Sequence, residues 1–187
     1  MSSDPFKPLD GARRDAGTGK GMPPRSVAVA VPPDGPKPPG RHYEKGKPSA
    51  TWPYRDAAGA DMGYACRFDE KDGGKTFLPL TWCQDGKKWR WKSWAEPRPL
   101  FGLDRLAQDP GAPVVVTEGE KAADAAQRLL DGYVCVTSPN GSKSAGKADW
   151  SPLKSRNVTI WPDADEAGLK YAETVAGLAA DAGAASV

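Results

Sequence analysis

The stretch PVVVTEGEKAADAAQRLLDG, residues 113–132, determines the expected fold of this chain of 187 residues. Its first part, 113–117, is a continuous apolar run, which is typical of a β-strand buried on both faces of a sheet. Apolar residues then recur at helical spacing and predict a helix over 119–131 that ends near Gly132. The expected apolar face of this helix consists of Ala122, Ala125, Ala126 and Leu129. A buried strand followed directly by such a helix is the unit from which α/β folds are built.

The chain beyond this stretch continues the alternation. Apolar runs at 133–137 and 157–161 predict two more buried strands, and a second helix is expected over 166–180. Residues 184–187 resemble the start of a further strand, so we expect a C-terminally truncated fragment. The order of elements indicates an α/β domain over 111–187, with a mainly parallel sheet flanked by helices.

Residues 50–110 follow a different pattern, typical of a small antiparallel β-rich subdomain. Two short strands are expected within 51–68, a third at 76–83 and a fourth at 88–94, separated by turns rich in Gly, Asp and Lys. A short helix at 103–108 then leads to the α/β domain.

The N-terminal region is rich in proline and basic residues. Residues 1–50 hold ten of the nineteen prolines and carry nine Lys and Arg against five Asp and Glu. Such a segment buries too little apolar surface to offset its ordering entropy, which predicts a disordered basic tail over 1–49. Its charge is compatible with loose contacts to nucleic-acid phosphates, and equally with a solvated surface.

Composition excludes several classes of protein. Three widely spaced cysteines and one histidine form no CxxC pair or His/Cys cluster, which argues against zinc and against a disulfide scaffold. A reducing, cytoplasmic location is therefore expected. No apolar stretch approaches the roughly 18 residues needed to span a bilayer, and the N-terminus lacks the apolar core of a secretory signal.

Three acidic residues follow two of the predicted parallel strands. Glu118 comes directly after the first strand, and Asp163 and Asp165 follow the third. The carboxyl ends of parallel strands meet at one edge of the sheet, where ligands bind in α/β proteins. Three neighbouring carboxylates repel one another unless a hard cation lies between them. Oxygen ligands alone favour Mg²⁺ or Mn²⁺.

Two motifs around these acids resemble the Toprim domain of phage and plasmid DNA primases and primase-helicases. VVVTEGEKAADA, residues 114–125, is similar to the first Toprim motif, a strand that ends in Glu-Gly and opens a helix. WPDADEAG, residues 161–168, is similar to the second motif, Asp-x-Asp followed by Ala-Gly. The resemblance covers about residues 112–187 and is weaker over 50–111.

The resemblance implies Mg²⁺-dependent nucleotidyl transfer in DNA replication, with RNA primers made from ribonucleoside triphosphates on single-stranded DNA. It assigns acid–base catalysis to Glu118 and metal binding to Asp163 and Asp165, together with Glu118. Lys121 lies one helical turn further and can offer a cation to phosphate. A replicative helicase is an expected partner. A Toprim nuclease or topoisomerase-like enzyme, or a non-catalytic nucleic-acid-binding module, are the alternatives.

The same acids have a simpler interpretation as helix caps. Thr117 and Glu120 have the spacing of a capping box for the first helix. Asp165 is a natural N-cap for the second helix, and Asp163 is favoured there by the helix dipole. Capping alone does not explain why acids follow both strands at one edge.

The segment GSKSAGK, residues 141–147, nearly matches a P-loop, but Ala148 stands where Ser or Thr should follow the lysine. Gly141 and the lysines Lys143 and Lys147 can bind phosphate of a nucleotide or nucleic acid through backbone N–H groups and charge. A flexible surface loop is the alternative.

Tryptophans and basic residues alternate along the fourth predicted strand. Trp89 and Trp91 can stack on nucleic-acid bases while the neighbouring lysines and arginine hold the backbone. Tryptophans in such a small sheet more often form its core, and we favour that interpretation.

Overall fold

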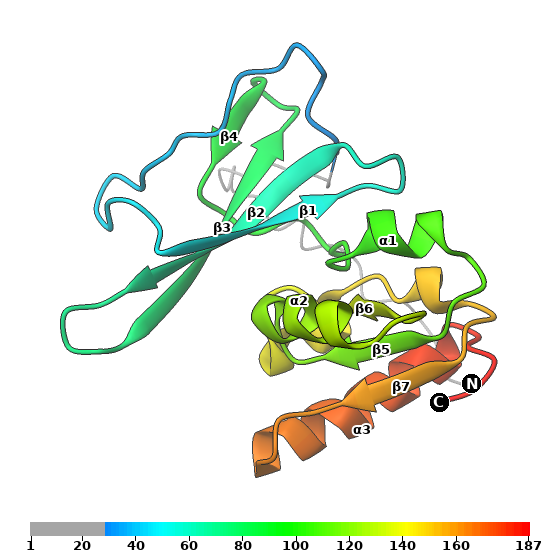
Figure 1. Ribbon diagram of the computed structural model, residues 1–187. Helices are drawn as coiled ribbons and strands as arrows, with labels where there is room; N and C mark the ends of the chain where they lie inside the picture. Colours follow the sequence, from blue (N-terminus) through cyan, green and yellow to red (C-terminus); the bar gives the residue numbers. More distant parts are fainter. Residues whose placement is uncertain (1–28) are drawn as a thin grey trace, which may run out of the picture.

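A computed structural model describes residues 29–187 and shows two β-sheets of opposite type (Figure 1). The first is antiparallel, in the order β1-β2-β3-β4, with β1 over Ala50–Arg55, β2 over Asp61–Asp69, β3 over Lys75–Cys83 and β4 over Lys88–Arg90. Helix α1, Leu103–Gln108, connects this sheet to the second one. The predicted antiparallel, β-rich region is thus present.

The second sheet is parallel, in the order β6-β5-β7. Its strands are β5, Val114–Thr117, β6, Val134–Val136, and β7, Val158–Trp161. Helix α2 covers Glu120–Leu129 and α3 covers Glu166–Asp181, while two short 3₁₀ helices, η1 (Ser142–Lys147) and η2 (Ser151–Leu153), lie between β6 and β7. The predicted α/β fold class is confirmed.

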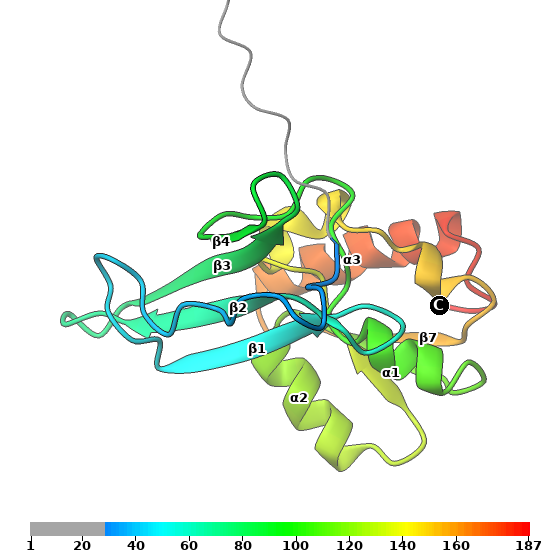
Figure 2. The ribbon, with the colours of Figure 1, turned by 90° about the horizontal axis from the view of Figure 1, so that it is seen from above.

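The two helices cover opposite faces of the parallel sheet. Val115 of β5 packs with Ala126 of α2, whereas Val114 and Val116 belong to the larger core that includes Val175 of α3. This alternation explains why all four residues of β5 are buried. Figure 1 shows β5 between β6 and β7, and Figures 1 and 2 show α2 and α3 on different sides of this half of the molecule.

The apolar face of α2 differs from the predicted one. Ala123 and Ala126 are buried, whereas Leu129 is 75% exposed. Ala123 packs under the antiparallel sheet rather than against β5. Helix α2 therefore contacts both sheets, with Ala123 toward the antiparallel one and Ala126 toward the parallel one, which a single apolar stripe in the sequence does not predict.

Strand β4 is shorter than predicted because, after Arg90, the chain crosses from one face of the antiparallel sheet to the other. Trp91 packs on one side of the antiparallel sheet, while Trp94 lies on the other side with its ring centre 4.6 Å from that of Tyr54. Gly63 admits this approach, since a Cβ there would lie 2.7 Å from the Trp94 ring. A straight strand over 88–94 cannot bury both tryptophans in this way.

Residues 29–49 form a strap across the antiparallel sheet, on the face turned away from the parallel one (Figure 1). Val31 donates a backbone hydrogen bond to Asp61, and the Trp89 indole donates to the Pro36 carbonyl at 2.7 Å. His42 is 6% exposed and contacts the rings of Phe68 and Trp91. The predicted tail boundary at residue 50 therefore does not separate this segment from the fold; the rest of the predicted tail, 1–28, lies outside the described residues.

None of the helices in the described part of the chain is long and apolar enough to cross a membrane.

Candidate metal-binding site at the carboxyl edge of the parallel sheet

Strands β5 and β7 are direct neighbours, as the predicted site requires. They pair in parallel, with Val116 opposite Ile160 and Thr117 opposite Trp161. Glu118 is the first residue after β5, and Asp163 is the second after β7. The parallel register therefore brings these two acids to the same edge of the sheet.

The Glu118 side chain lies between this edge and the first turn of α3. A Cβ built on Gly168 would lie 2.7 Å from the Glu118 Oε1 atom and 2.2 Å from the Asp163 carbonyl oxygen, which shows how close α3 approaches. Oε1 is buried and has no hydrogen-bond partner among residues 29–187. A buried carboxylate oxygen without a donor is costly and needs a proton or a cation.

The surroundings of Glu118 affect the pKa of its carboxyl group. Burial raises the pKa of the Glu118 carboxyl above its usual range, and the negative charges of Asp163 and Asp165 raise this pKa further. A hydrogen bond from the Asp163 backbone partly offsets the increase. The edge therefore carries concentrated negative potential.

Asp165 caps helix α3. Its Oδ1 atom accepts a 2.7 Å hydrogen bond from the Gly168 backbone N–H, and its backbone is extended, as expected of an N-cap residue. The predicted cap is confirmed. Because the bond uses one carboxylate oxygen, the side chain has a second oxygen with which to bind a cation.

The turn that carries Glu118 is held by two hydroxyl groups. The Thr117 carbonyl oxygen accepts hydrogen bonds from Tyr171 Oη at 3.0 Å and from Thr137 Oγ1 at 2.7 Å. Both donors are buried. Tyr171 was not among the predicted site residues, although its spacing of three from Gly168 and four from Val175 places it on the buried face of α3.

The predicted capping box at α2 does not form. Gly119 is the N-cap and has no side chain to offer, while the Thr117 hydroxyl donates to the Gly119 carbonyl at 3.3 Å. Glu120 instead accepts a 2.7 Å hydrogen bond from the buried Tyr54 hydroxyl. A tertiary partner thus replaces the local one, and burial raises the pKa of the Glu120 carboxyl.

The Gly/Lys segment after β6 forms 3₁₀ helix η1 and is not an irregular loop. Gly141 begins it with a left-handed φ of 65°, and a Cβ there would lie 3.8 Å from the Glu118 carbonyl oxygen. Ala145 is buried and its carbonyl accepts from the Trp150 indole at 2.9 Å. Gly141 therefore lies at the same edge as the acids.

The predicted phosphate-binding lysines differ in their surroundings. Lys121, Lys143 and Lys147 are all exposed. The Lys147 Nζ atom lies 3.6 Å from the Glu96 carboxylate, which couples its charge to the segment that follows β4. Lys143 lies only two residues after Gly141, the glycine at the acidic edge, and is therefore nearer to that edge in sequence than Lys147.

Trp89 and Trp91 pack against the buried cluster of Cys66, Phe68 and Leu80. The Trp89 ring lies 5.7 Å from those of Tyr64 and Trp82, and the Trp91 ring 5.9 Å from that of Phe68. These positions fit the favoured interpretation as core residues. Both rings are only partly buried, so base stacking by them stays a prediction.

No three His, Cys, Asp or Glu side chains within residues 29–187 meet as a preformed metal-binding group. The three acids Glu118, Asp163 and Asp165 thus lie at the same edge of the sheet, but their carboxylates do not converge on one point.

Comparison with solved structures yields a structural likeness. No protein-family model matches this chain, and no curated protein matches it significantly. A solved structure that is similar is described as bacteriophage T7 lagging-strand DNA polymerase interacting with primase domains of two gp4 subunits bound to an RNA/DNA hybrid and dTTP. The identity is 22% and the TM-score 0.46 over 72% of this chain. This chain spans 60% of the length of that one.

Proposed function

We propose that Glu118, Asp163 and Asp165 bind Mg²⁺ or Mn²⁺ and that the chain is part of a Toprim-type DNA primase or primase-helicase. The observation that carries the proposal is the Oε1 atom of Glu118, which is buried without a hydrogen-bond partner among the described residues, at the sheet edge where Asp163 and Asp165 also lie. The Toprim-like motifs of 114–125 and 161–168 supply the family expectation. Single-stranded DNA and ribonucleoside triphosphates are the proposed substrates, and a replicative helicase is the proposed partner.

The residues at this edge fit a hard divalent cation. All three donors are carboxylates, which Mg²⁺ and Mn²⁺ prefer. The Glu118 Oε1 atom is buried and unpartnered among the described residues, so that a cation can satisfy it. Burial and the negative charges of Asp163 and Asp165 raise the pKa of Glu118, and a cation offsets both effects.

The chain's own groups have distinct tasks in the proposed reaction. Glu118 accepts the proton of an attacking 3′-hydroxyl, while the new bond to the α-phosphorus forms and pyrophosphate leaves. Asp163 and Asp165 would hold the cation, which when bound would neutralise phosphate charge. Lys121 and Lys143 are exposed on segments that follow β5 and β6, and are proposed to contact phosphate.

Asp165 combines two proposed tasks, because it caps helix α3 with one carboxylate oxygen and would bind the cation with the other. Its Oδ1 atom is fixed by the Gly168 N–H at 2.7 Å. The turn before Glu118 is fixed by Tyr171 and Thr137. These bonds hold the backbone on both sides of the site, so that binding needs to order only the carboxylate side chains.

Primer synthesis on single-stranded DNA with labelled ribonucleotides tests the proposal. The chain, or a longer form that contains it, is expected to extend primers with Mg²⁺ and to lose this activity in Glu118→Gln and Asp163→Asn. Asp181→Asn, at the exposed end of α3, is the matched control and should retain activity. Metal-dependent cleavage of DNA without synthesis would instead favour the nuclease alternative, and nucleic-acid binding with neither reaction the non-catalytic one.

A further inference from the structure

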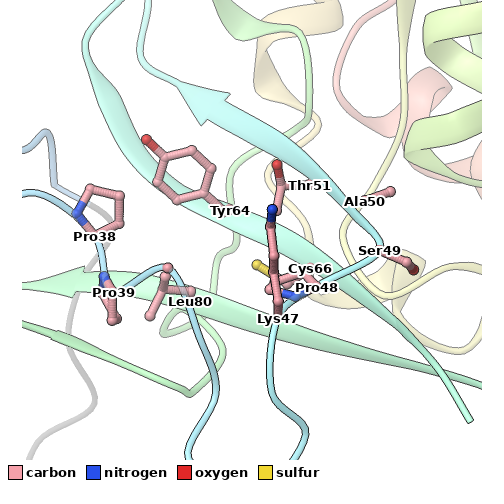
Figure 3. Close-up of a pocket in the computed structure, with 11 residues that line it drawn as sticks. Pro38, Pro39, Lys47, Pro48, Ser49, Ala50, Thr51, Tyr64, Cys66 and Leu80 are labelled. Carbon is pink, nitrogen blue, oxygen red and sulfur yellow. The ribbon is translucent and has the colours of Figure 1, made fainter.

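A pocket of about 310 Å³ lies between the strap and the antiparallel sheet (Figure 3). Pro38 and Pro39 line one side, and Lys47 and Pro48 line the other. Its volume is at the lower end of the range for small-molecule sites, which runs from about 300 to 1,000 Å³. The pocket has the size for one small rigid group.

The floor of the pocket is apolar and well anchored. Tyr64 and Cys66 of β2 and Leu80 of β3 lie on one face of the sheet, since Tyr64 pairs directly with Leu80. The Tyr64 hydroxyl donates a 2.5 Å hydrogen bond to Asp61, which fixes its ring. Prolines in the walls have restricted backbones. A flat ring is the group that such a slot accommodates best.

The pocket carries a positive charge. Lys47 is its single charged lining residue. The surrounding strap segment, 37–47, holds four basic residues (Lys37, Arg41, Lys45 and Lys47) against one acidic residue, Glu44. Lys45 is paired with Glu70 at 2.6 Å, whereas Lys47 lies at the pocket itself. The ligand is therefore expected to be an anion.

From the apolar slot and its cation we infer that this pocket binds a nucleobase whose attached phosphate pairs with Lys47. The base lies against the Tyr64 side of the floor, where stacking requires no particular sequence. Thr51 has an exposed side chain at the rim and is available to the sugar or base edge. The same chemistry is present in a free nucleotide and in single-stranded nucleic acid.

The inferred site is separate from the acidic edge. The pocket face of the antiparallel sheet carries Cys66, Phe68 and Leu80, whereas the opposite face carries Trp52 and Tyr54 and packs toward α2. The inference therefore goes beyond the proposed function and does not require a divalent cation.

Binding of a fluorescein-labelled oligothymidylate, measured by anisotropy in EDTA over a salt series, tests the inference. Lys47→Ala should reduce the slope of log K against log salt by about 0.7, the value for one phosphate contact to a single strand. Lys71→Ala, an exposed lysine of the β2–β3 turn that does not line the pocket, is the control and should keep the slope. Thr51→Trp, which fills the pocket without changing charge, should weaken binding at least about fivefold.

Competitors identify what the pocket recognises. Displacement by thymidine monophosphate supports the inference with a free nucleotide as ligand, and displacement by unlabelled oligothymidylate alone supports it with a strand. Equal displacement by an oligoglutamate peptide would overturn it, since charge alone would then suffice. Equal slopes for Lys47→Ala and Lys71→Ala, or no binding by the wild type, would also overturn it. Circular dichroism of each variant establishes that it is folded.

Discussion

The Tyr54 hydroxyl of β1 donates a 2.7 Å hydrogen bond to the Glu120 carboxylate at the start of α2. Tyr54 is fully buried and Glu120 is 8% exposed. The bond joins the antiparallel sheet to helix α2 of the α/β half across 66 positions of sequence. It also lies two residues from Glu118, so that the candidate site and the contact between the two halves share one turn.

Removal of the Tyr54 hydroxyl should destabilise the whole fold. Tyr54→Phe leaves the Glu120 carboxylate buried without its donor, which costs about 1–3 kcal/mol in the free energy of unfolding. Urea denaturation measures this change. Tyr43→Phe is the control, since Tyr43 is 80% exposed, and it should have little effect. Equal stability of Tyr54→Phe and the wild type would show that the bond does not hold the two halves together.

Gly168 is expected to tolerate no side chain. In Gly168→Ala the new Cβ would meet Glu118 Oε1 and the Asp163 carbonyl, so α3 must shift, at a cost of about 1–3 kcal/mol. Gly177→Ala in the same helix meets nothing within 4 Å and should raise stability by about 0.5–1 kcal/mol. Thermal unfolding of the two variants should move in opposite directions; a shift in the same direction contradicts the close approach of α3.

Two substitutions of Asp165 separate its cap from its charge. Asp165→Ala loses the bond to Gly168 and should cost about 0.5–2 kcal/mol. Asp165→Asn keeps a capping oxygen and should retain most of the stability while losing affinity for Mn²⁺. If Asp165→Asn binds Mn²⁺ like the wild type, Asp165 is a cap only.

Because the Cys66 thiol is buried, we expect the free energy of unfolding to decrease at alkaline pH. Burial raises the pKa of its thiol from 9.0 to about 11. The thiol's contribution to stability is therefore fully present below pH 9.0 and is lost as pH rises through about 11, because the unfolded chain ionises first. The free energy of unfolding should fall more steeply over this window in the wild type than in Cys66→Ala. Parallel curves would contradict the assignment.

Much of the parallel half could be predicted from sequence because its signals are local. The apolar run of β5 and the helical spacing after it depend on burial by immediate neighbours, and the adjacency of β5 and β7 follows from common α/β topology. The Asp165 cap also depends on a hydrogen bond between residues only three positions apart in the sequence.

The contacts that differ from expectation are made over long distances in sequence. Glu120 has a capping-box spacing, yet it binds Tyr54, because a buried hydroxyl donor from another sheet satisfies it better than a local amide. Residues 29–49 have a composition typical of disorder, yet His42 and Pro36 find partners on β2–β4 and the segment after them. Amino-acid composition alone does not reveal such tertiary contacts.

Binding of Mn²⁺, followed by electron paramagnetic resonance, tests the central claim most directly. The wild type should bind Mn²⁺ saturably at millimolar concentration or below, and Mg²⁺ should compete. Asp163→Asn should lose this binding, whereas the matched variant Asp181→Asn should retain it. A wild type that binds no Mn²⁺ at millimolar concentration, or an Asp163→Asn variant that binds it equally well, would contradict a metal site at this edge.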